Sequence, residues 1–418
     1  MKISRLINKN ETIYYLFYFF WIIVLLPKPA QLVLLFAVSL YLIGLKKEIK
    51  RDWFIDTQYL VLAIYGISII YNLFISDHDI VRVFAAFNTF MITFTALMLY
   101  RVYSSVEIDG KRIGKSCLIN LGILALILII YIISPNKEGL SILGHAISTG
   151  DLLYNEATTR FVGLFAYSNL LGLFSLVSFP FIIEWLKDKK RFFFYSIGII
   201  LLNFLFSYYA NSRSGQLIII MLLCGFVFTY ILTKLQIEQR KVFVIIAIAL
   251  ILIIGILSWQ YVYFKLSDML LARAGSNSSR LTIYESSIKL VLERSPVIGM
   301  GIKDMLSTLP YPYGSHSSYI GYFYKAGILG GIIYLCSFMV YAYKLFKWKK
   351  RDIGDYTLFI CIMLMLIWMI LEDLDGANWG ICYAFILMGY TSCKSNEKYF
   401  NPPSEMGEQT KQRRCIEC

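Results

Sequence analysis

The most regular feature of this sequence is a succession of apolar runs separated by short polar segments. A helix of about 20 apolar residues crosses the roughly 30 Å hydrocarbon core of a bilayer and satisfies its own backbone hydrogen bonds. Strand-like alternation is absent. The pattern predicts an all-α polytopic membrane protein with about twelve transmembrane helices, near residues 12–27, 30–45, 58–76, 80–100, 117–134, 165–186, 192–210, 215–233, 242–263, 318–345, 355–372 and 377–393.

One polar interruption is much longer than the others and forms a loop at about residues 265–317. Apolar residues recur in it at helical spacing: Leu281, Tyr284, Ile288 and Val291. We therefore expect an amphipathic helix in this loop, with Ser279 as its N-cap and Pro296 just beyond its end.

Composition and charge give the orientation of these helices. The chain is 58% hydrophobic and only 16% charged, whereas soluble domains carry nearer a quarter charged residues. The net charge of +13 comes mainly from clusters at residues 46–51, 111–112, 187–191, 234–241 and 347–351. Starting the N-terminus in the cytoplasm puts all of them on that side, as the positive-inside rule requires. The basic excess thus indicates membrane topology and argues against nucleic acid as a partner.

The two ends of the chain are both expected in the cytoplasm. The basic N-terminus precedes an apolar stretch without a small-residue cleavage site, so we expect a first membrane helix rather than a signal peptide. Residues 1–393 are predicted to form one transmembrane domain whose loop at about 265–317 is extracytoplasmic. Residues 394–418 are polar and contain prolines, which predicts a disordered tail. Cys415 and Cys418 in this tail are only a weak indication of zinc or redox chemistry.

Five arginines lie in segments placed outside, where the positive-inside rule does not explain them: Arg160, Arg213, Arg273, Arg280 and Arg294. Guanidinium groups match phosphate oxygens, so arginines at the rim of a membrane cavity suit a pyrophosphate-bearing ligand. Arg160 and Arg213 are each expected at the mouth of a span. A single arginine can equally contact lipid headgroups. His316 would be able to take a proton from a sugar hydroxyl, while His78 and His145 receive no role.

Four stretches resemble the O-antigen polymerase and ligase superfamily, over roughly residues 160–335. They are Arg160-Phe-Val-Gly163-Leu-Phe165 with Ser168-Asn169 and Gly172; Ser212-Arg213-Ser214-Gly215; Arg280 and Tyr284 with Pro296-Val-Ile-Gly299-Met-Gly301; and His316-Ser317 followed by Gly327-Ile-Leu-Gly330. Tyr284 stands where many members have Trp. Lys325 stands where the residue is often acidic, so no role is transferred to it, and a lysine there would snorkel or meet a phosphate. The Gly327 to Gly330 stretch would permit close helix packing or take part in ligand binding.

The resemblance implies a glycosyltransferase that takes its glycan from an undecaprenyl-pyrophosphate donor on the outer leaflet, without a metal or other cofactor. Arg160 and Arg213 would hold the pyrophosphate and Arg280 would assist from the loop. Asn169 and Tyr284 would complete the substrate-binding set. His316 would be the catalytic base or would position the acceptor. The acidic group Glu372, Asp373 and Asp375 keeps a metal-dependent glycosyltransferase open.

Three functions follow from these observations. The first is polymerisation of lipid-linked repeat units for O-antigen, capsule or exopolysaccharide in a bacterial cytoplasmic membrane, alongside flippase and chain-length regulator proteins. The second is ligation of a finished glycan to lipid A core or another surface acceptor, because ligases share these motifs. The third is transport of lipid-linked glycans, which predicts broken helices, charges within spans and related halves. Mid-span charge is scarce apart from Lys325, and no internal repeat is evident.

Overall fold

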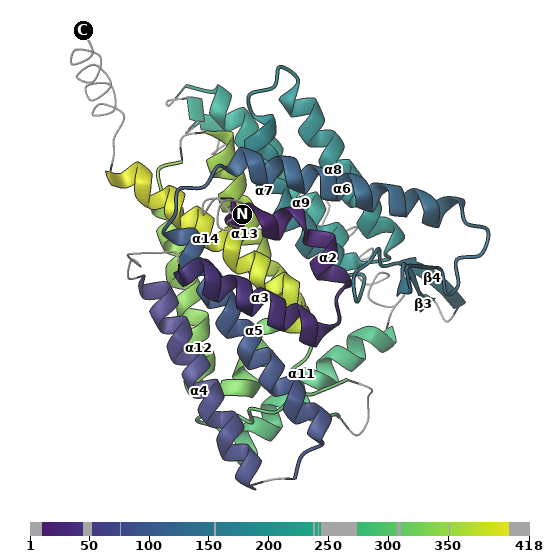
Figure 1. Ribbon diagram of the computed structural model, residues 1–418, viewed down its shortest axis with the longest axis vertical. Helices are drawn as coiled ribbons and strands as arrows, with labels where there is room; N and C mark the ends of the chain where they lie inside the picture. Colours follow the sequence, from purple (N-terminus) through teal and green to yellow (C-terminus); the bar gives the residue numbers. More distant parts are fainter. Residues whose placement is uncertain are drawn as a thin grey trace, which may run out of the picture.

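The structure, a computed structural model, describes residues 11–44, 52–75, 77–153, 156–236, 239–240, 242–243, 274–306, 311–350 and 352–400 (Figure 1). Almost all regular structure in these residues is helical. Seven of the described helices are long and apolar enough to cross a membrane, judged by length and composition. The predicted all-α polytopic class is therefore confirmed.

The N-terminal third contains six helices: α1 (Thr12–Tyr18), α2 (Phe20–Leu25), α3 (Lys28–Gly44), α4 (Trp53–Ile75), α5 (Ile80–Ser104) and α6 (Gly110–Ile133). The predicted first span is thus two short helices that meet at Phe19, whose backbone leaves the helical region (φ −101°, ψ 22°). Aromatic packing explains this break. Phe20 packs edge-on against Trp379 and Tyr383, which holds α2 against the interior.

The rest of the described chain contains α7 (Leu170–Leu186), α8 (Phe192–Tyr209), α9 (Arg213–Lys234), α11 (Ala274–Arg294), α12 (Ser318–Lys347), α13 (Ile353–Leu371), a 3-10 turn η2 (Leu374–Gly376) and α14 (Asn378–Phe400). Apart from the first, each span predicted within the described residues corresponds to one helix. The span predicted at 242–263 lies outside the described residues except for its first two.

Two predictions about helix ends were wrong. Ser279 lies inside α11 and does not cap its start, although Pro296 does follow its end as predicted. Residues 394–400 belong to α14 rather than to a disordered tail, while 401–418 lie outside the described residues. Lys394 explains the longer helix, because its ammonium group pairs with the buried Glu184 at 2.6 Å and holds this turn against α7.

Two hairpins occupy the segment after α6, where no strands were predicted. Strands β1 (Ser141–Ile142) and β2 (His145–Ala146) are joined by a tight turn, and β3 (Ser148–Leu153) pairs antiparallel with β4 (Glu156–Phe161). Leu143 and Gly144 form that turn with φ values of 51° and 79°, which fits a type I′ hairpin. Figure 1 shows β3 and β4 beside the end of α6, where the Tyr131 hydroxyl donates to the Thr159 carbonyl.

Helix α14 lies at the centre of the helical bundle (Figure 1). Every side chain from Asn378 to Ser392 is buried, so this helix is enclosed by protein. It packs against α5 along its length and against α7 and α13. The connection from α13 to α14 is therefore also held inside the bundle, and this connection carries three acidic residues.

Helix α12 is broken at Gly327, whose φ of 66° and ψ of −165° lie outside the helical region. The segment 296–301 fills the break with its own backbone. Four hydrogen bonds of 2.8 to 3.2 Å join the two: Met300 and Gly301 donate to the carbonyls of Tyr324 and Lys325, and Ile328 and Leu329 donate to those of Pro296 and Val297. A Cβ at Gly327 would collide with the Val297 carbonyl oxygen. The third and fourth sequence motifs therefore form a single unit.

Candidate active site

The acidic segment, residues 372–375, lies between α13 and α14 and gathers charges from three other elements. Glu372 pairs with Arg280 of α11 at 2.8 Å, and Asp373 pairs with Lys303 of the 296–306 segment at 3.2 Å. Asp375 pairs with Lys325 of α12. Glu372 is only 2% exposed. Buried carboxylates require such partners, so the acidic segment fixes the relative positions of the three cationic side chains.

Glu372 also lies within hydrogen-bonding distance of polar residues at the starts of α7 and α9. Asn169 Nδ2 donates to Glu372 Oε1 at 2.5 Å, and Asn169 Oδ1 accepts a hydrogen bond from Ser212 Oγ at 2.7 Å. Ser214 Oγ lies 3.5 Å from the same carboxylate oxygen. These two serines flank Arg213, the first residue of α9. The structure therefore brings Asn169, Arg280 and the start of α9 together around one carboxylate.

His316 is held beside this cluster from both sides. Its carbonyl accepts a hydrogen bond of 2.6 Å from the Tyr284 hydroxyl. Two residues later, Ser318 Oγ donates to the Glu372 carbonyl at 3.0 Å and accepts from the Leu374 amide at 2.8 Å. His316 itself has a φ of 64°, which is uncommon for a residue with a side chain. Its position is thus fixed by α11 and by the acidic segment together.

The electrostatics of the site favour a neutral His316. Burial, together with the positive charges of Arg280 and Lys303, lowers the pKa of His316 to about 4. A neutral imidazole has a free nitrogen lone pair and is able to accept a proton. Burial raises the pKa of Glu372 to about 7, although Arg280 opposes this rise. Burial also raises the pKa of Asp373, whereas the pKa of Asp375 is lowered because Lys325 and Lys303 outweigh its burial.

The predicted site residues do not all have the settings expected for them. Arg213 does stand at the start of a helix, where Ser212 caps α9 by accepting from the Gly215 amide at 3.1 Å. Arg160 was expected at the mouth of a span but lies in strand β4, ten residues before α7 begins. Its Nε lies 3.5 Å from Thr149 Oγ1, the residue opposite it in the hairpin. Sequence periodicity gave no indication of this strand.

Sequence analysis missed the role of the acidic segment and of Lys303. The signal was present, because three carboxylates stand between two long apolar runs where charge is costly. Lys325 was expected to snorkel or meet a phosphate, and instead it is buried and paired with Asp375. His78, which received no role, lies with Nδ1 2.9 Å from Asp304 Oδ2 and so ties the start of α5 to the 296–306 segment.

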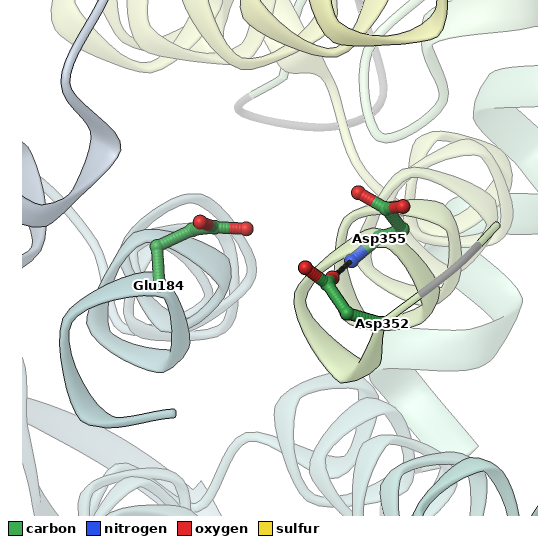
Figure 2. Close-up of side chains that lie close together, drawn as sticks. All are labelled: Glu184, Asp352 and Asp355. Atoms are coloured by element: carbon green, nitrogen blue, oxygen red, sulfur yellow. Dashed lines mark hydrogen bonds between the residues drawn. The ribbon is translucent and has the colours of Figure 1, made fainter. Parts of the chain in front are cut away.

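A separate acidic cluster lies where the C-terminal end of α7 meets the N-terminal end of α13, at the ends of these helices that are remote from the acidic segment. Figure 2 shows Glu184 of α7 facing Asp352 and Asp355 at the start of α13. One carboxylate oxygen from each of the three lies within 4.8 Å of the other two. Lysines already pair with two of its carboxylates: Lys187 Nζ is 3.0 Å from both Glu184 and Asp352, and Lys394 Nζ is 2.6 Å from Glu184. We therefore interpret this cluster as an ion-pair network that fastens three helix ends.

The fold and the enclosed charge cluster define a multi-pass α-helical membrane protein with a polar site buried among its helices. Residues 198–335, about a third of the chain, match the family model of the O-antigen ligase. The resemblance to the O-antigen ligase and polymerase superfamily is thereby confirmed, and members of this family are glycosyltransferase-like enzymes. The match includes Arg213, Arg280, Tyr284 and His316, whereas Arg160, Asn169 and the acidic segment lie outside it. Among curated proteins, no match to the chain is found.

Proposed function

We propose that the protein is an extracytoplasmic glycosyltransferase that polymerises undecaprenyl-pyrophosphate-linked repeat units for O-antigen, capsule or exopolysaccharide. The observation that carries the proposal is the convergence of Asn169, Arg280 and His316 on the acidic segment, with the start of α9 alongside. Two of these three residues, and Arg213, lie within the segment that matches the O-antigen ligase family.

The reaction that suits this site is a displacement at the anomeric carbon of the donor sugar. The acceptor hydroxyl oxygen forms a bond to that carbon as the bond to the pyrophosphate oxygen breaks, and the pyrophosphate leaves with the electron pair. Arg213 and Arg280 are proposed to stabilise the charge that grows on it, because fixed guanidinium groups act more strongly on the transition state. Arg160 is proposed to contact the same donor from the hairpin.

His316 is proposed to take the proton from the acceptor hydroxyl. Its pKa, lowered to about 4, leaves the imidazole neutral at physiological pH, so a ring nitrogen is free to accept the proton, although burial and the nearby cations also make it a weaker base than a free histidine. The Tyr284 hydroxyl donates to the backbone carbonyl of His316, so Tyr284 holds the backbone of His316 in place. The cationic groups supply the charge stabilisation that a metal gives in other glycosyltransferases, so we propose a metal-independent reaction without a cofactor.

A ligase is the second candidate, because the matching family model is that of the O-antigen ligase. It would use the same donor and differ in its acceptor, lipid A core or another surface molecule. A transporter of lipid-linked glycans is a third candidate, since α12 is broken at Gly327 beside the buried Lys325. Discontinuous helices and buried charges are common at transport sites.

The proposed setting is the bacterial cytoplasmic membrane, with both termini in the cytoplasm and the active site on the outer face. The loop at about 265–317, of which the structure describes residues 274–306 and 311–317, is proposed to lie over that face. Flippase and chain-length regulator proteins are the proposed partners, since a polymerase needs a supply of outer-leaflet donor and a stop signal.

An in vitro reaction tests the proposal. Purified protein would be incubated with lipid-pyrophosphate-linked repeat units, and the products resolved by gel. A polymerase gives a ladder with donor alone, whereas a ligase gives a product only when a core acceptor is added. Failure of both reactions, with movement of the donor across proteoliposome membranes, would identify a transporter and contradict the proposal.

A further inference from the structure

The ion pair between Lys325 and Asp375 is the most enclosed charged contact in the described part of the chain. Lys325 is 1% exposed, and the Asp375 side chain is 6% exposed. The lysine ammonium lies 3.9 Å from the Tyr322 ring centroid and 5.5 Å from that of Tyr65. Such a pair costs desolvation energy and is weak evidence for stability by itself, so its presence calls for another explanation.

The pair lies at the end of a short half-helix. Residues 318–326 form the first part of α12, which stops at the break at Gly327. At the break, the carbonyls of Tyr324 and Lys325 bond to the 296–301 segment instead of continuing the helix. The half-helix is thus a separate unit whose C-terminal end is held by Lys325 and Asp375, and a cation at that end is favoured by the helix dipole.

The other end of this half-helix begins immediately after His316. There Ser318 makes two hydrogen bonds with the acidic segment, to the Glu372 carbonyl and from the Leu374 amide. Ser318 at one end of the half-helix and Lys325 at the other are therefore both attached to the acidic segment, residues 372–375. The same acidic segment carries Glu372, which holds Arg280. These attachments therefore link the half-helix that follows His316 to the segment that holds Arg280.

We propose that Lys325 and Asp375 are positioning residues that hold the half-helix 318–326, and with it His316, in register with Arg280. The proposal rests on the transfer reaction proposed above. In this proposal neither residue touches the reacting atoms, and both act through the position of His316. If the pair is broken, the C-terminal end of the half-helix loses its attachment to the acidic segment and keeps only its backbone bonds to the 296–301 segment. His316 then shifts relative to Arg280, Lys303 and Tyr311, the charged and aromatic groups that face it.

The test uses the full-length protein and four variants. Lys325→Met and Asp375→Asn each break the pair, and the double variant Lys325→Glu with Asp375→Lys restores it in reverse. Lys111→Met is the matched control, since it breaks an exposed pair with Asp188 at 2.6 Å. The first readout is the pH dependence of diethyl pyrocarbonate modification at His316, resolved by peptide mass spectrometry. The second readout is kcat and KM for glycan transfer by the folded fraction.

The single variants are expected to move the His316 titration upward, towards the ordinary histidine pKa of about 6.5. They should also lower kcat by about a hundredfold with little change in the KM for donor, because misplacement by an ångström has effects of that size. The reversed pair should recover most of the wild-type His316 titration and most of the wild-type kcat. Lys111→Met should match the wild type in both.

Two outcomes would overturn the proposal. One is a single variant that melts earlier while its folded fraction keeps the wild-type titration and kcat, which would make the pair merely stabilising. The other is a reversed pair that folds without restoring the titration. If the single variants do not fold, the double variant Lys325→Met with Asp375→Asn takes their place, because it removes both charges and leaves neither buried without a partner. An unchanged titration in that variant again overturns the proposal. Should wild-type protein transfer no glycan, the proposed function fails, yet the His316 titration still decides the role of the pair.

Discussion

His316 carries the clearest local constraint in the site, because its backbone has a φ of 64°. This region costs a residue with a Cβ about 1 to 2 kcal/mol, whereas glycine adopts it freely. The conformation is maintained by the Tyr284 hydroxyl on one side and by Ser318 on the other. Strain of this kind is found where function fixes a side chain in a position that local preference would not choose.

The cost of this conformation is measurable. We predict that His316→Gly unfolds at a higher temperature than His316→Ala, with a difference of about 1 kcal/mol, because only glycine relieves the strain. Both variants lack the imidazole and both should be inactive. Thermal unfolding of the purified variants in detergent tests the order. Equal melting temperatures would mean that the residue is not held in this conformation.

Glu372 gives a pH-dependent contribution to stability. Its pKa is raised by burial from 4.5 to about 7, so the folded state binds its proton more tightly than the unfolded state does. The stabilisation is complete below about pH 4.5 and is lost as the pH rises through about 7, to the extent of about 3 kcal/mol. Glu372→Gln cannot ionise and lacks this dependence.

We therefore predict that Glu372→Gln becomes more stable relative to the wild type as the pH rises from 4.5 to 8. Thermal unfolding of both proteins across that range gives the difference directly, because titrating groups that do not interact with Glu372 contribute to both curves alike. A constant offset between the two curves would show that Glu372 is not buried as the structure places it.

Among the elements, the break in α12 depends on two glycines that face each other. A Cβ at Gly299 would collide with the backbone nitrogen of Gly327, and a Cβ at Gly327 would collide with the Val297 carbonyl. Both glycines have positive φ, at 80° and 66°. The 296–301 segment and α12 consequently approach each other as backbone to backbone, which no other residue type permits at these positions.

Substitution at the break should be far more costly than at an ordinary helical glycine. We predict that Gly327→Ala and Gly299→Ala each destabilise the protein by more than about 2 kcal/mol and abolish transfer. Gly198→Ala in α8 is the control, because its Cβ would meet open space and helix propensity favours alanine by up to about 1 kcal/mol. Thermal unfolding and activity of the three variants decide the point, and comparable melting temperatures for all three would refute it.

The helices were predictable from sequence because apolar length alone determines which segments enter a membrane. Their interruptions were not. The Phe19 break depends on aromatic partners in α14, and the Gly327 break depends on a segment that precedes α12 in the chain. Arg160 was expected at the mouth of a span because its strand, paired antiparallel with β3, shows no alternation of apolar and polar residues in the sequence. Motif resemblance selected Asn169, Arg280 and His316, whereas the Glu372 carboxylate that binds Asn169 and Arg280 lies beyond those motifs.

At the scale of the whole molecule, the two charged clusters lie at opposite ends of the same helices. The acidic segment follows α13 and Asn169 precedes α7, while Glu184 and Asp352 lie at the other ends of these two helices. Lys187 and Lys394 at that second end belong to the basic side that the positive-inside rule assigns to the cytoplasm. The proposed active site would then face outward.

This orientation predicts the accessibility of two exposed positions. In a chain without its native cysteines, Glu138→Cys between α6 and the first hairpin should react with a membrane-impermeant maleimide in intact cells. Lys190→Cys, between α7 and α8, should react only after the membrane is permeabilised. The reverse pattern would invert the topology and exclude an outer-leaflet reaction.

The most direct test of the central claim compares two histidines in one reaction. Glycan transfer from a lipid-pyrophosphate donor would be measured for wild type, His316→Ala and His145→Ala, each normalised to folded protein. His145 lies in strand β2 and is not among the residues assigned to the site. We predict that His145→Ala retains the wild-type rate and that His316→Ala loses at least about a hundredfold, because base catalysis contributes factors of that size. Transfer by His316→Ala at the wild-type rate would contradict the assignment of this cluster as the active site.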